Sequence, residues 1–238
     1  FFVWGGTKVK QKNADSSPCI RVGAYGPQAC WCPFSGLNFW GAVKWGKKKI
    51  MDINKLIAFR RAVYPSQFNK GEIDKGTLDQ LLENANMAPT HKMTQPWFFK
   101  VYKNKAKSRL GKAMVQAMEA HNPDDTRADF KQKNTLEKCR LSNCILGIFM
   151  KRSTAVSIPE WEEIAAVAMA VQNIWLSCVD QKIGCYWSSP QYTAQMHSFF
   201  DLNVNERCLG FMYMGKFDHT TLPVKERMSM ASKVEWLF

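Results

Sequence analysis

The sequence predicts an α+β fold with three layers, in which helices cover both faces of a central mixed sheet. Helical and strand-like patterns both occur, but they do not alternate regularly enough for a doubly wound parallel sheet. The GxGxxG fingerprint of dinucleotide-binding folds does not occur in the chain. A chain of 238 residues is long enough for one substantial domain with a buried core.

Residues 1–50 differ from the remainder in composition and are expected to form little regular structure. They contain four of the nine Trp, three of the eight Cys, and eight Lys or Arg against one acid. Trp45-Gly46 requires a GGGG block in the coding sequence shortly before the Met51 codon, as in a bacterial ribosome-binding site. We therefore expect 1–50 to be an upstream-translated or non-native extension, and 51–238 to be the functional domain. A basic arm for nucleic acid or anionic lipid and a remnant of cloning are the alternatives.

Apolar residues at helical or strand spacing divide the domain into successive elements. Asp52 and Asp74 suit the N-caps of the first two helices, and Pro65 ends the first of them. Pro159 introduces the longest helix and Pro190 opens the last one. The elements expected are helices at about 52–61, 74–86, 104–120, 160–182 and from 190 toward 200, a polar helical stretch before residue 144, and strands at 97–102, 144–150, 184–187 and 207–215.

Three short motifs carry residues suited to binding, although each has an ordinary structural interpretation. Arg60-Arg61 ends a helix, where two basic groups complement the helix dipole. The stretch 88–97, Ala-Pro-Thr-His to Gln-Pro-Trp, is a polar loop between a helix and a strand. Trp187-Ser188-Ser189 precedes a proline and is typical of a strand-end turn. His91, a single histidine in the second motif, more often braces such a loop than binds a ligand.

The order of these motifs resembles that of the nitroreductase family, homodimeric flavoenzymes that hold FMN and take hydride from NADH or NADPH. The stretch 59–63 is similar to the family's opening Arg-Arg-Ser segment. Residues 86–97 are similar to its second motif, in the short bacterial form with Ala-Pro-x-His. Residues 184–190 are similar to its third flavin-contacting loop, and strand 208–215 is a further match. The resemblance covers residues 51–238.

The resemblance implies which residues contact the cofactor. It places Arg60 on the FMN phosphate, Arg61 nearer the ribityl chain or ring, and Arg227 as a third charge on the phosphate. Met87 and His91 would line the flavin of the neighbouring subunit. The implied cofactor-binding residues are Arg60, Arg61, Ala62, Tyr64, Met87, His91, Trp187, Ser188, Ser189 and Arg227, with Ser177 and Lys182 near the nicotinamide nucleotide. No side chain is assigned a catalytic role, because the hydride chemistry belongs to the flavin.

The resemblance also implies an assembly. The family has a three-layer α/β/α fold around a mixed, mainly antiparallel sheet, and forms a homodimer in which the C-terminal segment reaches the partner subunit. The alanines of the helix at 160–182 are small enough for another helix to approach closely, which suits a central core helix, a dimer interface, or both. The apolar end of the tail, with Trp236, Leu237 and Phe238, must pack on another surface.

Two positions depart from the family's pattern. Ala62 stands where relatives often have Ser, which removes one hydroxyl donor near the phosphate. Tyr64 stands where relatives usually carry Lys or Arg near the flavin pyrimidine, and Tyr brings no positive charge. Because that charge stabilises the anionic reduced ring, we expect a lower flavin reduction potential than in typical members, unless Lys92 or a backbone dipole substitutes.

The sequence therefore predicts an FMN-dependent oxidoreductase that passes hydride from NAD(P)H to a small organic acceptor, such as a nitroaromatic or quinone, by a ping-pong mechanism. A flavin-binding sensor or carrier with little turnover is the alternative that Ala62 and Tyr64 keep open. The charge of 51–238, with 25 basic and 19 acidic side chains, does not call for a nucleic-acid partner. A cytoplasmic protein without membrane contact or metal is expected, because no apolar run approaches a membrane span and the cysteines lack metal spacing. The cysteines at 139, 144, 178, 185 and 208 are interpreted as structural thiols.

Overall fold

The structure, a computed structural model, describes residues 52–218 and 226–238. The expectations for residues 1–50 concern a part of the chain outside these ranges. Among the described residues one sheet is formed by the strands β1 (Trp97–Tyr102), β2 (Cys144–Lys151), β3 (Ile183–Ser188) and β4 (Glu206–Lys216). Their order across the sheet is β1-β2-β4-β3, which makes β3 an edge strand.

All three strand pairings in this sheet are antiparallel, which confirms the mainly antiparallel character. The parallel pairing of a mixed sheet is absent from the strands that the described residues form. β2 and β3 do run in the same direction, as strands joined by a long helix often do, but β4 inserts between them.

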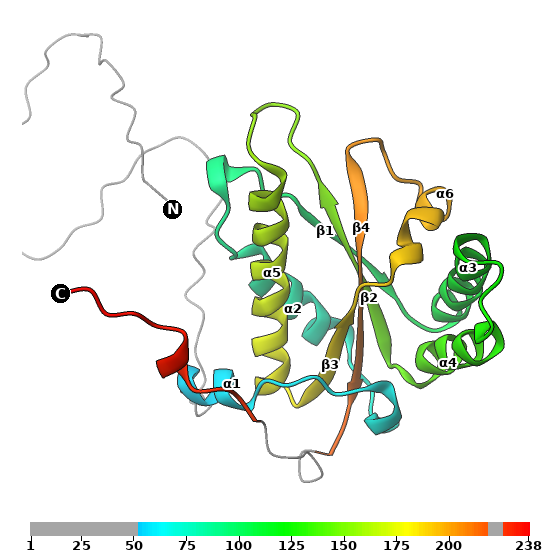
Figure 1. The fold of residues 1–238 in the computed structure, drawn as a ribbon. Coiled ribbons are helices and arrows are strands. Elements are labelled where there is room, and N and C mark those ends of the chain that lie inside the picture. Colours follow the sequence, from blue (N-terminus) through cyan, green and yellow to red (C-terminus); the bar gives the residue numbers. More distant parts are fainter. Residues whose placement is uncertain (1–51, 219–225) are drawn as a thin grey trace, which may run out of the picture. The chain divides into compact units, whose positions relative to one another are not determined.

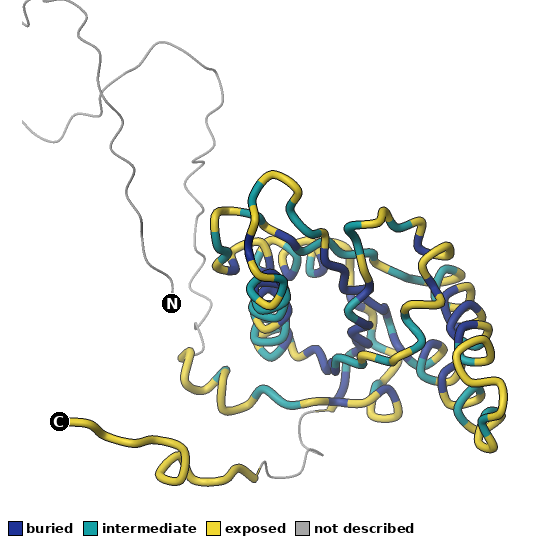
Figure 2. The backbone as a smooth tube through the Cα atoms, turned by 45° about the horizontal axis from the view of Figure 1, so that its top comes forward, coloured by how far each residue is buried: buried dark blue, intermediate teal, exposed yellow. Residues whose placement is uncertain are grey.

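Helices cover both faces of the sheet, and the three-layer fold is confirmed (Figure 1). One face packs against α2 (Lys75–Asn86) and α5 (Glu160–Asp180), and the other against α3 (Lys105–His121), α4 (Ala128–Leu141) and the short α6 (His197–Phe200). Alternate residues of β2 serve the two cores: Leu146 and Ile148 face α2 and α5, whereas Ile145 and Phe149 face α3 and α4. Figure 2 shows the buried strands between the helical layers.

Side-chain caps fix the starts of the first two helices as expected. The Asp52 carboxylate accepts a hydrogen bond from the Asn54 amide at 3.0 Å, at the start of α1 (Ile53–Phe59). The Asp74 carboxylate accepts from the Thr77 amide at 2.8 Å, and hydrogen bonds from Thr77 hold the pKa of this carboxyl below its ordinary value. α1 ends two residues earlier than expected, because Arg60 is already extended, with ψ of 124°.

Short 3-10 helices, which apolar spacing does not predict, connect the main elements. They are η1 (Pro65–Gln67), η2 (His91–Met93), η3 (Gln191–Met196) and η5 (Met230–Ser232). The helix expected from Pro190 toward Phe200 therefore begins as η3 and becomes α-helical only at α6. Among the described residues no helix is both long and apolar enough to cross a membrane.

The cysteines of the described residues are buried and unpaired, which confirms their interpretation as structural thiols. Burial raises the pKa of the Cys139 thiol to about 11 and that of Cys144 to about 12. Thiols that ionise so reluctantly are poor nucleophiles, so they stabilise the core rather than take part in chemistry.

Candidate functional site

The extended segment that follows α1 lies along the free edge of β3. The Val63 amide donates a hydrogen bond to the Cys185 carbonyl oxygen at 3.1 Å, so the segment pairs with the strand. The Trp175 indole N–H of α5 donates to the Arg61 carbonyl oxygen at 3.1 Å. The Arg60 guanidinium lies over the Trp175 ring, 4.8 Å from its centroid. Strand β3 and helix α5 therefore fix both arginines of the first motif.

Gly184 allows this segment to approach the sheet. A Cβ atom at Gly184 would lie 2.7 Å from Val63 Cγ1 and 2.9 Å from Phe217 Cδ1. Any larger side chain would have to push the segment away from β3. The glycine that opens the third motif thus has a packing role that supports the position of the first motif.

A cavity of about 250 Å³ opens beside the Arg61 side chain. Its walls are aromatic and aliphatic apart from the guanidinium, and they consist of Phe59, Arg61, Val63, Trp175, Val179, Ile183 and Phe217. Such a lining suits a ligand that has a flat or apolar portion and an anionic group.

Tyr64 faces away from this cavity. Its ring centroid lies 4.9 Å from that of Tyr186, which in turn stacks on Tyr213 at 5.2 Å. Tyr186 and Tyr213 belong to the core between the sheet and the α3–α4 layer. Ala62 is exposed between the two arginines and the tyrosine. The two departures from the family's pattern therefore differ in kind. Ala62 lacks the hydroxyl group that relatives often have, whereas Tyr64 directs its ring toward the core between the sheet and the α3–α4 layer.

A β-bulge in β4 shapes the end of β3, where Trp187 to Ser189 lie. Gly210 has a φ of +126°, and a Cβ there would lie 2.3 Å from the Ser188 carbonyl oxygen. The Trp187 indole N–H donates to the Leu209 carbonyl oxygen at 3.1 Å. This indole N–H is thus engaged within the protein, so Trp187 can offer a ligand its ring and backbone but not its side-chain donor.

The loop of the second motif is conformationally strained and attached to the start of α5. Lys92, Met93 and Gln95 have φ values of 48°, 55° and 44°, a region that non-glycine residues rarely adopt. Strain of this kind persists only where surrounding contacts impose it, and it is common at functional sites. His91 Nδ1 contacts a carboxylate oxygen of Glu162 in the first turn of α5.

Met87 and Ser177 lie in a separate groove of about 400 Å³ between α1, α2 and α5. Met87 is 71% exposed there, and the Ser177 hydroxyl accepts a hydrogen bond from Asn84 Nδ2 at 2.8 Å. Lys182 is exposed between α5 and β3, with a φ of 54°. Arg227, in the separate range 226–238, is exposed and donates to the Glu226 carbonyl oxygen at 2.7 Å.

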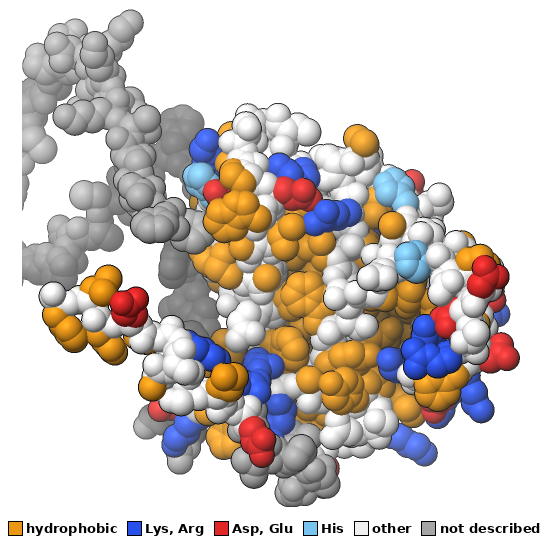
Figure 3. Space-filling view, in the orientation of Figure 1, with side chains coloured by type: hydrophobic (Ala, Val, Ile, Leu, Met, Phe, Trp, Pro, Cys, Tyr) orange, Lys and Arg blue, Asp and Glu red, His pale blue; other side chains and the backbone are white. Residues whose placement is uncertain are grey.

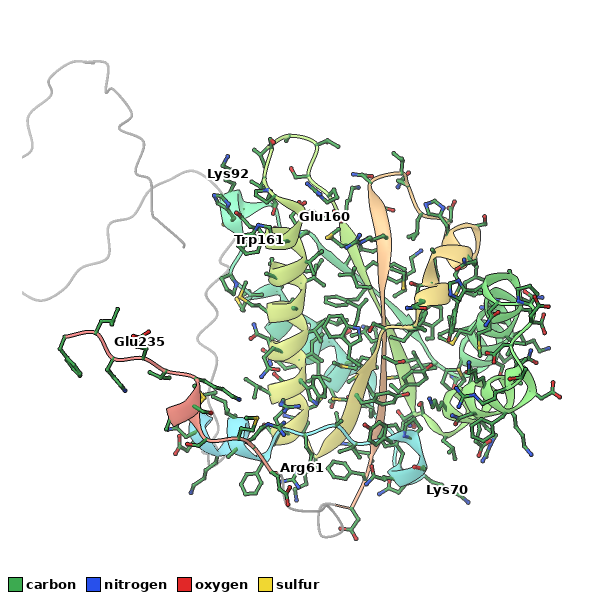
Figure 4. All side chains as sticks on the ribbon, in the orientation of Figure 1. Arg61, Lys70, Lys92, Glu160, Trp161 and Glu235 are labelled. Carbon is green, nitrogen blue, oxygen red and sulfur yellow. The ribbon has the colours of Figure 1, made fainter. Side chains whose placement is uncertain are left out.

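One chain does not bring all the expected residues together. Arg60 and Arg61 contact Trp175, and Trp187 and Ser188 end β3, whereas His91 contacts Glu162, thirteen residues before Trp175 on the same helix. Thirteen residues of α-helix correspond to about 20 Å of rise and about 140° of rotation. Figure 4 shows this separation, with Arg61 at one end of α5 and Lys92, Glu160 and Trp161 at the other.

Comparisons with known proteins decide the family. The sequence model described as "Nitroreductase family" matches residues 57–216, about two thirds of the chain. The chain belongs to the nitroreductase family. Among its relatives is the Bacillus subtilis protein named "Putative NAD(P)H nitroreductase YfhC", which is 25% identical over 186 residues, covering 74% of this chain and 93% of that one.

Solved structures of nitroreductases have the same fold. A nitroreductase-like family protein from Bacillus cereus superposes with a TM-score of 0.68 at 24% identity, covering 81% of this chain and 99% of that one. The FMN-dependent nitroreductase NfnB from Mycobacterium smegmatis, solved in complex with NADPH, superposes with a TM-score of 0.62 at 18% identity, covering 78% and 97%. At these identities the likeness establishes the fold, and the roles of individual residues rest on their geometry.

Two residues that contact the motifs were missed by sequence reasoning. Trp175 holds both arginines of the first motif, yet in the sequence it is one apolar residue of a long helix. Glu162 holds His91, and its only sequence signal is its place three residues after Pro159 at a helix start. Neither pairing is local, so spacing alone could not reveal it.

Proposed function

We propose that this nitroreductase is an FMN-dependent oxidoreductase that takes hydride from NADPH or NADH and passes it to an organic acceptor such as a nitroaromatic or quinone. The observation that carries this proposal is a segment, held by Trp175 and β3, that places the Arg60 guanidinium over the Trp175 ring and Arg61 on the wall of a cavity with mainly apolar side chains. The family assignment supports the flavin and the nicotinamide reductant. A cytoplasmic location is part of the same proposal.

The residues present fit FMN. A doubly charged phosphate needs several donors, and two adjacent guanidinium groups supply them in a planar arrangement that matches phosphate oxygens. The flat ring needs an apolar wall and donors for its carbonyl groups. The apolar side chains of the cavity beside Arg61 can supply such a wall. Ser188 and Ser189 lie outside that cavity, at the end of β3, and carry hydroxyl and backbone groups that can bond the ring carbonyls.

Each residue then has a limited task, because bound FMN itself supplies the hydride acceptor and donor. Arg60 and Arg61 bind the phosphate end, and Trp175 holds the Arg60 side chain and the Arg61 backbone in place. Ser188 and Ser189 orient the ring through hydrogen bonds. Arg227 adds charge from the C-terminal segment, while Ser177 and Lys182 assist the nicotinamide nucleotide.

The functional unit is a homodimer in this proposal. His91 lies about 20 Å along α5 from the arginines and on another side of that helix, so a second chain must bring its own His91 and Met87 to the site. Apolar side chains are available for such an interface. α1 has no buried residue, and its Ile53, Ile57 and Phe59 are each more than half exposed. In the view of Figure 3 further apolar side chains gather over the middle of the domain, between α5 and the α3–α4 layer. The tail supplies Trp236, Leu237 and Phe238 for exchange with the partner.

The ping-pong mechanism is tested by steady-state kinetics of the full chain. If nicotinamide and acceptor use the same flavin face in turn, double-reciprocal plots at several fixed quinone concentrations should give parallel lines. Intersecting lines would show that both substrates are bound together and would contradict a shared face.

Restoring a charge at position 64 is expected to raise the flavin reduction potential. A lysine would not be held against Tyr186 as the Tyr64 ring is. In the Tyr64→Lys variant its flexible chain can therefore bring an ammonium to the reduced ring and stabilise the anionic form. A charge-assisted hydrogen bond contributes about 1.5–3 kcal/mol, which corresponds to about 30–60 mV for a two-electron couple. Potentiometric titration of the wild type should give a value below that of free FMN, and the variant should lie higher.

The matched control is Tyr64→Phe, which keeps the ring beside Tyr186 and removes only the hydroxyl. Its potential should stay closer to that of the wild type than to that of the lysine variant. A lysine variant with an unchanged potential, or a wild type at or above free FMN, would contradict the role assigned to position 64.

A flavin-binding sensor or carrier with little turnover is the second candidate. The observation that favours it is that position 64 holds a neutral tyrosine packed against Tyr186, so it supplies no positive charge to the cofactor. Flavin reduction that stays slow with both NADPH and NADH would support this candidate over the oxidoreductase.

A further inference from the structure

The contact between His91 and Glu162 joins the second motif to the longest helix of the fold. His91 Nδ1 lies against the Glu162 carboxylate, and the two side chains are 42% and 21% exposed. Among the described residues the other ring nitrogen, Nε2, has no hydrogen-bond partner. The histidine is thus held through one nitrogen and offers the other to whatever approaches the loop.

Glu162 is available for this contact because of the way α5 begins. A glutamate at the third helical position usually bonds back to the amide of the N-cap residue. Here the N-cap is Pro159, which has no amide hydrogen to donate. Glu162 therefore cannot close a capping box, and its carboxylate extends to the loop instead.

The neighbouring acids of this helix turn have other partners. Glu160 pairs with Arg207 at 2.8 Å and with Arg152 at 3.6 Å. The buried Glu163 contacts Arg152 and accepts a hydrogen bond from the Ser153 amide at 2.9 Å. Glu160 and Glu163 thus share Arg152, and Glu162 is the acid whose partner lies in the second motif.

The loop itself holds His91 in a single conformation. The Thr90 hydroxyl lies 3.1 Å from the Thr94 hydroxyl and accepts a hydrogen bond from the Gln95 amide at 3.2 Å. These contacts close the loop in which Lys92, Met93 and Gln95 adopt left-handed conformations. A strained backbone conformation that is kept by such contacts is consistent with a need to place the His91 side chain accurately.

A carboxylate accepts hydrogen bonds but cannot donate them, so the proton on this side of the imidazole belongs to Nδ1. This holds for the neutral ring and for the protonated ring. Only Nε2 changes between the two forms, as an acceptor in the first and a donor in the second. The carboxylate thus selects both the ring orientation and the nitrogen that a ligand meets.

We propose that Glu162 is a positioning residue that fixes the tautomer of His91, so that Nε2 contacts the flavin or the molecule stacked on it in the neighbouring subunit. The inference rests on the proposed function, in which His91 serves the site of the partner. Lys92 of the same loop and Glu160 of the same helix turn are the charged groups nearest in the chain, and Figure 4 labels both. Neither of them makes a contact with the ring that would replace Glu162.

A double-mutant cycle in the full chain tests this proposal. Glu162→Leu and His91→Ala should each lower kcat/KM for NADPH about tenfold, as expected for the loss of one charge-assisted hydrogen bond. The double variant should be no slower than His91→Ala alone, because Glu162 acts only through the histidine. Glu162→Gln should recover most of the activity, since its amide oxygen still accepts from Nδ1.

The matched control is Glu160→Leu, which removes an acid from the same helix turn without touching His91. Its kcat/KM should remain that of the wild type. Additive losses in the double variant, or a wild-type rate for Glu162→Leu, would overturn the proposal and leave Glu162 a structural residue.

Nitrogen NMR of ¹⁵N-histidine-labelled protein provides a readout that does not depend on activity. The chain has four histidines, so the His91 signals are assigned by comparison with His91→Ala. The wild type should show a protonated Nδ1, and Glu162→Leu should lose this pattern. A wild type that binds no flavin would reject the proposed function, whereas a wild-type His91 protonated mainly at Nε2 would reject the role of Glu162.

Discussion

Replacing Arg60 with glutamine should weaken FMN binding about a hundredfold. The guanidinium is expected to give the phosphate two charge-assisted hydrogen bonds, each contributing about 1.5–3 kcal/mol. Its loss should therefore cost about 3 kcal/mol of binding, or roughly two orders of magnitude in Kd. The fold should survive, because the segment is held independently by the Val63–Cys185 and Trp175–Arg61 hydrogen bonds.

The dissociation constant is measured by titrating FMN into flavin-free protein and following the quenching of flavin fluorescence. Arg140→Gln is the matched control, because Arg140 is an exposed arginine of α4 that pairs with Glu137 at 2.5 Å. It should bind FMN like the wild type. A Kd for the Arg60 variant within twofold of the wild-type value would show that Arg60 does not bind the phosphate.

Replacing Glu163 with leucine should lower the stability of the domain by about 3 kcal/mol. The side chain is fully buried, contacts Arg152 and accepts from the Ser153 amide at 2.9 Å. Removing one partner of a buried ion pair leaves the other charge uncompensated, which costs about 3–5 kcal/mol. The lower end of this range applies, because the Arg152 side chain is about one-third exposed and keeps its ion pair with Glu160.

For a domain of this size the loss corresponds to a fall in melting temperature of about 10 °C. Thermal unfolding followed by circular dichroism measures it. Glu137→Leu serves as the control, since it removes an exposed acid from a surface pair and should leave the melting temperature nearly unchanged. An equally stable Glu163 variant would show that Arg152 finds full compensation elsewhere.

Local signals in the sequence were sufficient to predict most elements of the fold. Asp74 marked the start of α2, and the strand after Gln-Pro-Trp begins and ends at the expected residues. The end of α1 was misplaced because pairing between Val63 and Cys185, which are far apart in the chain, makes Arg60 extended. The insertion of β4 between β2 and β3 is likewise a property of the whole sheet.

The candidate site was predictable only in part for the same reason. The motifs themselves identify Arg60, Arg61 and His91 as candidates, and their roles in binding stay predictions. The residues that hold them, Trp175 and Glu162, come from two ends of α5 and have no local signature. The orientation of Tyr64 toward Tyr186 also depends on packing between strands rather than on spacing.

The measurement that most directly tests the central claim is a visible absorption spectrum of the purified 238-residue protein, before and after anaerobic addition of NADPH. The expected result is a flavin band that bleaches when NADPH is added, as the bound flavin is reduced. A band that persists with both NADPH and NADH would favour the sensor or carrier function. The absence of any flavin band, even after FMN has been added, would contradict the proposed FMN-dependent function.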